Sequence, residues 1–378
     1  MWRVSGLSGF VIVIGYGCNA GLEPSLFHCP ASTVLSASGI TRGRRSSEMD
    51  VPGTLVLTRD QIASLLSFDE YVVAVSDAFR LYAEGKAQLP GVVDIDAQNG
   101  AFHIKAASME LEQSYVAVKV NGNFPDNMSR FGLPTIQGAI LLYDGSKGYP
   151  LAFMDSIEIT IKRTGAATIL GAKHLARANS TCVTICGCGN QGRVTLAGLK
   201  SILPIERAFA FDTNSEAASR FAQQMTASLG IPVTPEASLS RAARASDVVV
   251  TATPSRVPLL TREDIAPGTC IAAVGADSHD KQELDPGLLV SNKLVVDSLE
   301  QCATIGELHH ALTAGLINES NVYAELGDII SGRKPGRTSA DEIIILDTTG
   351  TAIQDVAAAA AAFEKARKLG VGSVCRLA

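Results

Sequence analysis

A glycine-rich turn between two regular segments is the feature that most restricts what this chain can fold into. Residues 181–186 read TCVTIC, which is typical of a buried strand. The turn Gly187–Gly192 (GCGNQG) follows, and the next residues, RVTLAGLKSIL, have the apolar spacing of a helix. A strand, a G-x-G-x-x-G turn and a helix in this order are typical of the first βαβ unit of a Rossmann-type fold. The turn is therefore predicted to bind the pyrophosphate of a dinucleotide.

The residue types in this turn follow from the geometry that a dinucleotide site requires. Gly187 permits the tight turn, and Gly189 lets backbone N–H groups approach a phosphate without a Cβ in the way. Gly192 lets the helix pack closely on the strand. Asn190 and Gln191 open the helix, whose N-terminus offers positive potential to a diphosphate. We expect these five residues to contact or shape the cofactor site.

An acidic residue ends the second predicted strand of this region. The segment reads AFAFD, and its Asp212 lies about 20 residues beyond Gly192, the distance at which dinucleotide-binding folds place a ribose-binding acid. A carboxylate there accepts hydrogen bonds from ribose hydroxyls and repels a 2′-phosphate. Asp212 therefore favours NAD over NADP as the cofactor.

Two further predicted strands end in small or polar residues. Thr253 and Pro254 follow one of them, and Val274, Gly275 and Asp277 lie at the end of the other. The carboxyl ends of the strands in an open α/β sheet line its ligand crevice. We expect these residues at the cleft, with the acid at 277 close to where a nicotinamide ring and a substrate would meet.

The pattern of segments predicts an α/β protein with two domains. Across residues 179–319, short β-branched runs alternate with Ala-rich helical runs, which is typical of a Rossmann-type, doubly wound parallel sheet. Residues 51–178 instead show hairpin signals and strands that precede one long helix at 156–177. We expect residues 320–378 to fold back on this first part. The nucleotide-binding domain would then be inserted in a second, α+β domain.

The first fifty residues do not share this organisation. Their apolar run at 10–14 is too short to span a bilayer, and the cluster of Arg42, Arg44 and Arg45 fits no targeting class. A regular pattern begins only after Met49. Residues 1–50 are expected to be an unstructured extension, or sequence upstream of a natural start at Met49.

Charge and cysteine content exclude several classes of function. The net charge is −6 and basic residues are dispersed, so no basic surface for nucleic acid is predicted. The 8 cysteines form no C-x-x-C pair, and no His/Cys set has the spacing of zinc ligands. We expect free thiols, no metal site, no membrane segment and a reducing, cytoplasmic location.

Beyond residue 53, the chain resembles the ornithine cyclodeaminase/mu-crystallin family. The similarity extends from about residue 54 to 365. It is carried by the following stretches: Lys119-Val120-Asn121, Gly132-Leu133-Pro134-Thr135, Met154-Asp155, Arg163-Thr164-Gly165-Ala166-Ala167, Gly187–Gly192, Thr253-Pro254-Ser255, Gly275-Ala276-Asp277, Lys281-Gln282-Glu283-Leu284 and Gly336-Arg337-Thr338-Ser339.

The resemblance implies a bound nicotinamide cofactor and a homodimer built through the domain that does not bind nucleotide. It also implies that basic residues hold the carboxylate of a small amino or imino acid. By position, Lys119 and Arg163 match these basic residues. Asp277 matches the acid that handles protons, or the leaving amine, near Cα. Such roles are chemically reasonable, because paired cations fix an anion and an acid within reach of the amine can move its proton.

One departure bears on the substrate. Where ornithine cyclodeaminases carry an acid in the strand before Lys119, this chain reads FHIKAA and places Lys105. A base there resembles the branch with alanine dehydrogenases and cyclic-ketimine reductases, so Lys105 is a further expected substrate-binding residue. The sequence thus predicts hydride transfer at Cα of a small L-amino or 2-imino acid. Ornithine cyclodeamination with catalytic NAD is an alternative, as is a cofactor-binding protein with little catalysis. Retention of Lys119, Arg163 and Asp277 argues against the last.

Overall fold

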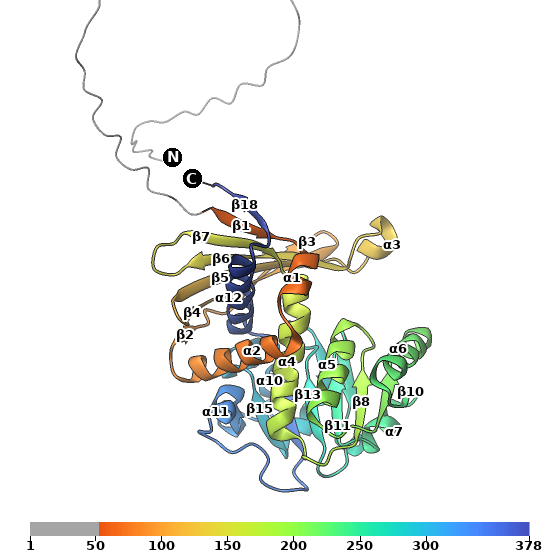
Figure 1. Cartoon of the computed structure of the whole chain (residues 1–378). Coiled ribbons are helices and arrows are strands. Elements are labelled where there is room, and N and C mark those ends of the chain that lie inside the picture. The colour runs from red at the N-terminus through yellow and green to blue at the C-terminus, as the bar shows by residue number, and fades with distance from the viewer. Residues whose placement is uncertain (1–52, 378) are drawn as a thin grey trace, which may run out of the picture. The chain divides into compact units, whose positions relative to one another are not determined.

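The computed structural model describes residues 53–377, which belong to one compact unit. The extension expected over residues 1–50 lies outside the described residues. Two large sheets and the helices between and around them make up this unit (Figure 1). Among residues 53–377, no helix combines the length and the apolar character needed to cross a bilayer.

The first sheet has eight strands and is antiparallel except where β1 lies parallel to β7. Its strand order is β18 (Ser373–Cys375), β1 (Thr54–Leu57), β7 (Pro150–Asp155), β6 (Ile136–Asp144), β5 (Ser114–Asn123), β4 (Gly100–Glu110) and β2 (Ala87–Gln88), with β3 (Val92–Ala97) paired to β4. The first part of the sequence predicts strands ahead of the long helix, and the structure has them; the short strands β2 and β18 were not predicted. The polar stretch 121–134, with its Gly, Pro and Asn residues, predicts a loop, but β5 continues through its first three residues to Asn123.

The second sheet also has eight strands, and all its pairings are parallel. Its order is β10 (Val233–Pro235), β9 (Arg207–Phe211), β8 (Cys182–Cys186), β11 (Val248–Thr251), β13 (Cys270–Ala273), β17 (Ile344–Asp347), β15 (Lys293–Val296) and β16 (Ala324–Glu325). A small parallel pair lies beside it, β12 (Arg256–Leu260) with β14 (Gln282–Leu284).

Strand β17 shows where the sequence-based division of the chain must be changed. Residues 320–378 were expected to return as a whole to the first sheet. Instead β17 pairs with β13 and β15 in the middle of the parallel sheet, and β16 pairs with β15. Ile344, Ile345 and Leu346 are fully buried between β13 and β15, and a strand that is covered on both faces needs such a continuous apolar run. The chain therefore returns to the first sheet only with the helix that follows β17.

Twelve α-helices in the described part of the chain surround the sheets. They are α1 (Arg59–Leu65), α2 (Phe68–Ala83), α3 (Asn127–Phe131), α4 (Ile157–Leu175), α5 (Asn190–Ile202), α6 (Ser215–Leu229), α7 (Leu239–Arg244), α8 (Pro286–Val290), α9 (Leu299–Ile305), α10 (Glu307–Thr313), α11 (Leu326–Ile330) and α12 (Ala352–Leu369). The first begins after Thr58, which forms a capping box with Gln61.

Alternation along the parallel strands divides the interior into two cores. Val248 and Val250 of β11 face the core that also contains α2, α4, α5, α6 and α12. Val249, between them, faces the smaller core with α7, α8, α9 and α10. Successive side chains of a strand point to opposite faces, so a strand that is covered on both sides must be apolar throughout. This explains why the central parallel strands, such as β11 and β13, read as continuous apolar runs.

Helix α12 joins the two sheets and positions part of the site. It is a run of alanines, most of them buried, that packs on β4 and β5 and against α2 and α4 (Figure 1). Alanine side chains let the helix approach several neighbours closely, and they cost no side-chain entropy on burial. Two polar residues in the first turn of α12, Gln354 and Asp355, are buried as well. The surroundings of Asp355 are described below.

The glycine turn has the conformation that its sequence predicts. Gly187 has φ of 99°, and a Cβ built there would lie 2.4 Å from the carbonyl oxygen of Ala252. At Gly192 a Cβ would lie 2.4 Å from the carbonyl oxygen of Gly187. A Cβ at Gly189 meets nothing within 4 Å. Two of the glycines are therefore needed by the fold itself, whereas the middle one borders open space.

This difference predicts opposite stability effects for two matched substitutions. Gly187→Ala should lower the free energy of unfolding by about 1–3 kcal/mol, because it adds a clash and a disfavoured φ. Gly189→Ala should cost less than about 1 kcal/mol, as expected for a cap position with room for a methyl group. Urea denaturation of both variants measures the difference. Equal losses would contradict the assignment of Gly187 to the tight turn.

Candidate active site

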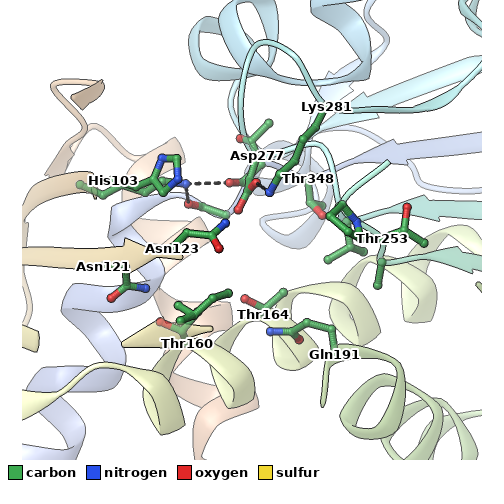
Figure 2. Close-up of a pocket in the computed structure, with 18 of the residues that line it drawn as sticks. His103, Asn121, Asn123, Thr160, Thr164, Gln191, Thr253, Asp277, Lys281 and Thr348 are labelled. Atoms are coloured by element: carbon green, nitrogen blue, oxygen red, sulfur yellow. Dashed lines mark hydrogen bonds and ion pairs between the residues drawn. The ribbon is translucent and has the colours of Figure 1, made fainter. Parts of the chain in front are cut away.

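A cavity of about 370 Å³ lies between the two sheets and receives side chains from both. Strands β4 and β5 and helix α4 form its walls on one side, and the segments after β11, β13 and β17 form them on the other. Figure 2 shows the labelled side chains converging on this space from the two sides. Among the described residues that line it, Asp277 is the sole carboxylate, and the basic residues outnumber it.

Two of the cations in this cavity share one buried carboxylate. Lys119 Nζ lies 2.6 Å from Asp355 Oδ2, and Arg163 Nε donates to Asp355 Oδ1 at 2.9 Å. Arg163 also donates from Nη1 to Gln354 Oε1 at 3.0 Å. The side chains of Lys119, Arg163 and Asp355 are only 4%, 5% and 1% exposed. Asp355 therefore orients Lys119 and Arg163 from behind the cavity wall, and both cations still line the cavity.

The charges of this group favour an anionic ligand. Burial alone would raise the pKa of Asp355, but Arg163 and Lys119 hold it below its usual value, so the carboxylate is ionised. Burial, together with the positive charge of Arg163, lowers the pKa of Lys119 to about 7, even though Asp355 opposes the shift. One carboxylate between two buried cations leaves an excess of positive charge, which a ligand carboxylate would balance.

Lys105 enters the same cavity from β4, the strand next to Lys119. Its Nζ donates to the carbonyl oxygens of Thr349 and Gly350, each at 2.9 Å, in the loop after β17. Burial lowers the pKa of Lys105, and the carboxylate of Asp277 counteracts this. The backbone N–H groups of the same two loop residues donate to Asp297 Oδ2. Lys105 is thus held between the two sheets, with its ammonium group at the cavity wall.

Asp277 lies on the opposite wall, just beyond β13. Its Oδ1 is 2.5 Å from Lys281 Nζ, and its side chain is about half exposed. Burial of the site would raise its pKa, but Lys281 and Lys105 lower the pKa to about 2, so Asp277 is a carboxylate at neutral pH. His103 of β4 points toward it across the opening (Figure 2), and His103 Nδ1 lies 2.7 Å from Asp94 Oδ1. An acceptor for an amine or iminium therefore faces the cations.

A second cavity, of about 380 Å³, adjoins the first. Thr253 and Pro254 line both, while Gly187, Gly189 and Asp212 line the second alone. Asp212 ends β9 and accepts the backbone N–H of Cys188 at 3.0 Å, so the acid lies directly beside the glycine turn. The ends of β8, β9, β11 and β13 thus form one continuous trough, which leads from the Asp212 carboxylate to the cationic cluster.

The residues along this trough fit a dinucleotide. The open space beside Gly189 leaves room for a pyrophosphate against the backbone, and α5 begins at the next residue with its N–H groups directed toward it. Gln191 Oε1 is buried beside the first cavity and has no hydrogen-bond partner among the described residues. Asp212 lines the second cavity, where its carboxylate could accept ribose hydroxyls. These features are those of a Rossmann-type dinucleotide site that ends in an anion-binding pocket.

The structure gathers most of the residues that the sequence singled out. The first cavity is lined by Lys105, Lys119, Arg163, Gln191, Thr253, Pro254, Val274, Gly275 and Asp277, and the second by Gly187, Gly189, Asp212, Thr253 and Pro254. Two lie elsewhere. Asn190 lines a separate groove between α4 and α5. Gly192 is buried against Gly187, where it serves helix packing and has no surface on either cavity.

Sequence reasoning missed the carboxylates that lie behind the cavity walls. Asp355 was not singled out, although an acid within an Ala-rich apolar helix was a usable signal of a buried charge partner. Asp297 and Glu283, both buried acceptors for loop N–H groups, were not found either. Their partners are close only in the folded chain. In the described part of the chain, no group of three or more His, Cys, Asp or Glu is arranged to hold a metal.

Comparisons with known proteins assign the family. The profile of the ornithine cyclodeaminase/mu-crystallin family matches residues 53–370, so the chain belongs to this family. The alanine dehydrogenase of Archaeoglobus fulgidus is 41% identical over 321 residues, covering 85% of this chain and 97% of that protein. The iminosuccinate reductase of Paracoccus denitrificans is 32% identical over 318 residues, covering 84% and 98%.

Solved structures are similar over the same range. An archaeal alanine dehydrogenase dimer with bound NAD superposes with a TM-score of 0.81 at 41% identity, covering 86% of this chain and 99% of that one. The Δ1-pyrroline-2-carboxylate reductase of Thermococcus litoralis, in complex with NADH and L-proline, gives a TM-score of 0.81 at 36% identity, covering 85% and 99%. The predicted fold class, α/β with a Rossmann-type sheet beside an α+β part, is confirmed.

The shared carboxylate predicts a large effect of removing Asp355 on stability. Asp355→Ala leaves Lys119 and Arg163 buried without their partner, and breaking a buried ion pair in this way costs about 3–5 kcal/mol. Unfolding by urea should show a loss of that order. Glu216→Ala, which removes the exposed partner of Arg220, is the matched control and should cost less than about 1 kcal/mol. A loss for Asp355→Ala no larger than the control's would contradict the proposed role of the cluster.

Proposed function

We propose that this chain is an NAD-dependent oxidoreductase that transfers hydride at Cα of a small L-amino or 2-imino acid. The observation that carries the proposal is the convergence of Lys105, Lys119 and Arg163 with Asp277 at one end of a dinucleotide-shaped trough. A 2-amino or 2-imino acid has one anionic and one cationic end. The cavity offers cations on one wall and a carboxylate on the other. The named activities of the family's alanine dehydrogenase and iminosuccinate reductase members support it.

In this proposal each residue has a defined task. Arg163 and Lys105 hold the substrate carboxylate, since a guanidinium can bind it bidentately. Lys119, whose pKa of about 7 lies near the working pH, moves a proton at its Nζ. Asp277, which stays ionised, holds the amine or iminium nitrogen next to Cα. When bound, the nicotinamide supplies or accepts the hydride. Solved relatives with bound NAD and NADH, and the acid at Asp212, favour NAD over NADP.

Ornithine cyclodeamination remains the second candidate, and one observation counts against it. A diamino acid carries a distal ammonium group, which needs a carboxylate of its own. Among the described lining residues, Asp277 is the sole carboxylate, and Lys281 already pairs with it. A cavity lined by Lys105, Lys119, Arg163 and Lys281 would repel the extra positive charge. The binding-only alternative is disfavoured because all the residues required for the chemistry lie together.

The same reasoning extends to assembly and location. The face of the antiparallel sheet opposite to Lys105 and Lys119 carries a group of exposed or half-buried apolar side chains: Val93, Phe102, Ile104, Val118, Leu141 and Phe153. An apolar face of this kind favours a second copy as its partner, and the archaeal alanine dehydrogenase is a dimer. We therefore propose a homodimer built through this sheet. Buried free thiols such as Cys182 and Cys302 agree with a reducing, cytoplasmic location.

The division into domains follows the sheets in this proposal. The substrate-binding and dimerisation domain comprises residues 53–178 with α12 and β18. The nucleotide-binding domain runs from 179 through β17. The expected boundary near 320 is thereby shifted to the end of β17, because β16 and β17 belong to the parallel sheet.

A substrate screen with one point variant tests the function. The wild-type protein should oxidise NADH in the presence of pyruvate plus ammonium, or of a cyclic ketimine. The loss of absorbance of the reduced nicotinamide measures this reaction. Asp277→Asn should lower kcat by about 10²-fold or more, because the neutral amide no longer balances the positive nitrogen. Asp280→Asn changes an acid of the same loop that lies outside the cavity lining, and it should retain activity. Release of ammonia from ornithine without net change in NADH would establish cyclodeamination instead.

The pKa of Lys119 predicts a pH dependence. Reduction of the substrate needs Lys119 in its protonated form, because its ammonium group attracts the substrate carboxylate and donates a proton. The value of kcat/KM for reduction should therefore fall as pH rises through about 7, the pKa of Lys119. The carboxylate of Asp355 raises this pKa, so Asp355→Asn should shift the falling limb to lower pH. Initial rates measured between about pH 5 and 9, on both sides of this pKa, show the shift. A limb that stays in place in Asp355→Asn would rule out Lys119 as the titrating group.

A further inference from the structure

Glu283 lies behind the strand ends at the junction of the two cavities, and it accepts hydrogen bonds from two neighbouring strand ends. Its Oε2 accepts the hydroxyl of Thr251 at 2.7 Å and the backbone N–H of Gly275 at 2.8 Å. Its Oε1 accepts the backbone N–H of Thr253 at 2.6 Å and the hydroxyl of the same residue at 2.8 Å. All four partners are donors, and Glu283 is fully buried. The arrangement thus uses the full acceptor capacity of a carboxylate.

The position of Glu283 is itself fixed from the other side. It belongs to β14, and the carboxylate of Glu307, at the start of α10, accepts the backbone N–H groups of Glu283 and Leu284 at 2.8 and 3.1 Å. Glu307 is also buried. Burial raises the pKa of Glu283, but the donors from Thr251, Thr253 and Gly275 oppose that effect and favour the ionised form.

The residues that Glu283 holds are those at the junction of the trough. Thr253 lines both cavities and Gly275 lines the first, whereas Glu283 lines neither. The fit is close: a Cβ at Gly275 would lie 2.3 Å from the carbonyl oxygen of Thr253 and 2.6 Å from Glu283 Oε1. The segments after β11 and β13 are therefore joined through one carboxylate, and a shift of that group would change the width of the passage between the cavities.

We propose that Glu283 is a positioning residue that sets Thr253 and Gly275 for the nicotinamide end of the cofactor. It never touches cofactor or substrate. It acts through the two segments whose backbone N–H groups donate hydrogen bonds to it. In other binding sites, residues behind the site orient the residues that contact the ligand in the same way. The inference rests on the proposed NAD-dependent function, because it names the residue that shapes the site where that cofactor would bind.

The isosteric variant Glu283→Gln tests this role. Its amide keeps the volume but turns an NH₂ toward at least one of the four donors. We expect the dissociation constant for NADH to rise by about tenfold or more, the scale on which a charge-assisted hydrogen bond affects an equilibrium. The KM for NADH should rise with it, while kcat at saturating NADH should fall much less. Binding is measured directly from the fluorescence of NADH, so turnover of a substrate is not required.

Asp247→Asn is the matched control. Asp247 is likewise a carboxylate that accepts backbone N–H groups, but it lies at the opposite end of the strands of the same sheet. Its carboxylate accepts the backbone N–H groups of Thr181 and Cys182, far along β8 from the glycine turn, and pairs with Arg177. This variant should lower the melting temperature and leave the affinity for NADH unchanged.

Three outcomes decide the question. A weaker affinity for NADH in Glu283→Gln but not in Asp247→Asn supports the positioning role. Unchanged affinity in Glu283→Gln, or an equal loss in both variants, overturns it and makes Glu283 a merely structural residue. If the wild-type protein itself binds no NADH, the proposed function fails, and the inference fails with it.

Discussion

The buried ion cluster around Asp355 is the interaction on which the site depends. It brings together three elements that are far apart in the chain: β5 with Lys119, α4 with Arg163 and α12 with Asp355. Burying these charges is costly, and pairing offsets the cost only in good geometry. The cluster therefore fixes how α12 and α4 pack beside the first sheet. It also leaves a net positive charge at the cavity, which makes an anionic substrate the natural ligand.

Buried acids have a second use in this fold, which is to hold the strand ends. Parallel strands that end at one edge bring their following loops together, and the backbone N–H groups of these loops need acceptors once they are buried. Glu283 receives such groups after β11 and β13, and Asp297 receives them after β17. The loops that border the cavities are thus fixed by carboxylates behind them, so the residues facing the trough remain free for ligands.

The sequence predicted the local features well and the long-range ones only in part. The glycine turn, Asp212 and the strand ends could be recognised because their physics is local: φ, a close approach, a strand period. Only the family resemblance placed Lys105, Lys119 and Arg163 in one site. The place of β17 could not be read from its sequence, because IIIL fits a central strand of either sheet. Nor could Asp355 be assigned to Lys119, since pairing across more than two hundred residues is a property of the packing.

Equilibrium binding of an unreactive carboxylate tests the central claim most directly. Propionate and propionamide have nearly the same shape and differ in charge, and each can be titrated into the NADH-loaded protein by calorimetry. The account predicts that propionate binds at least about tenfold more tightly than propionamide, and that Arg163→Ala removes most of this preference. Equal binding of the two compounds by the wild-type protein, or a preference that survives in Arg163→Ala, would contradict it.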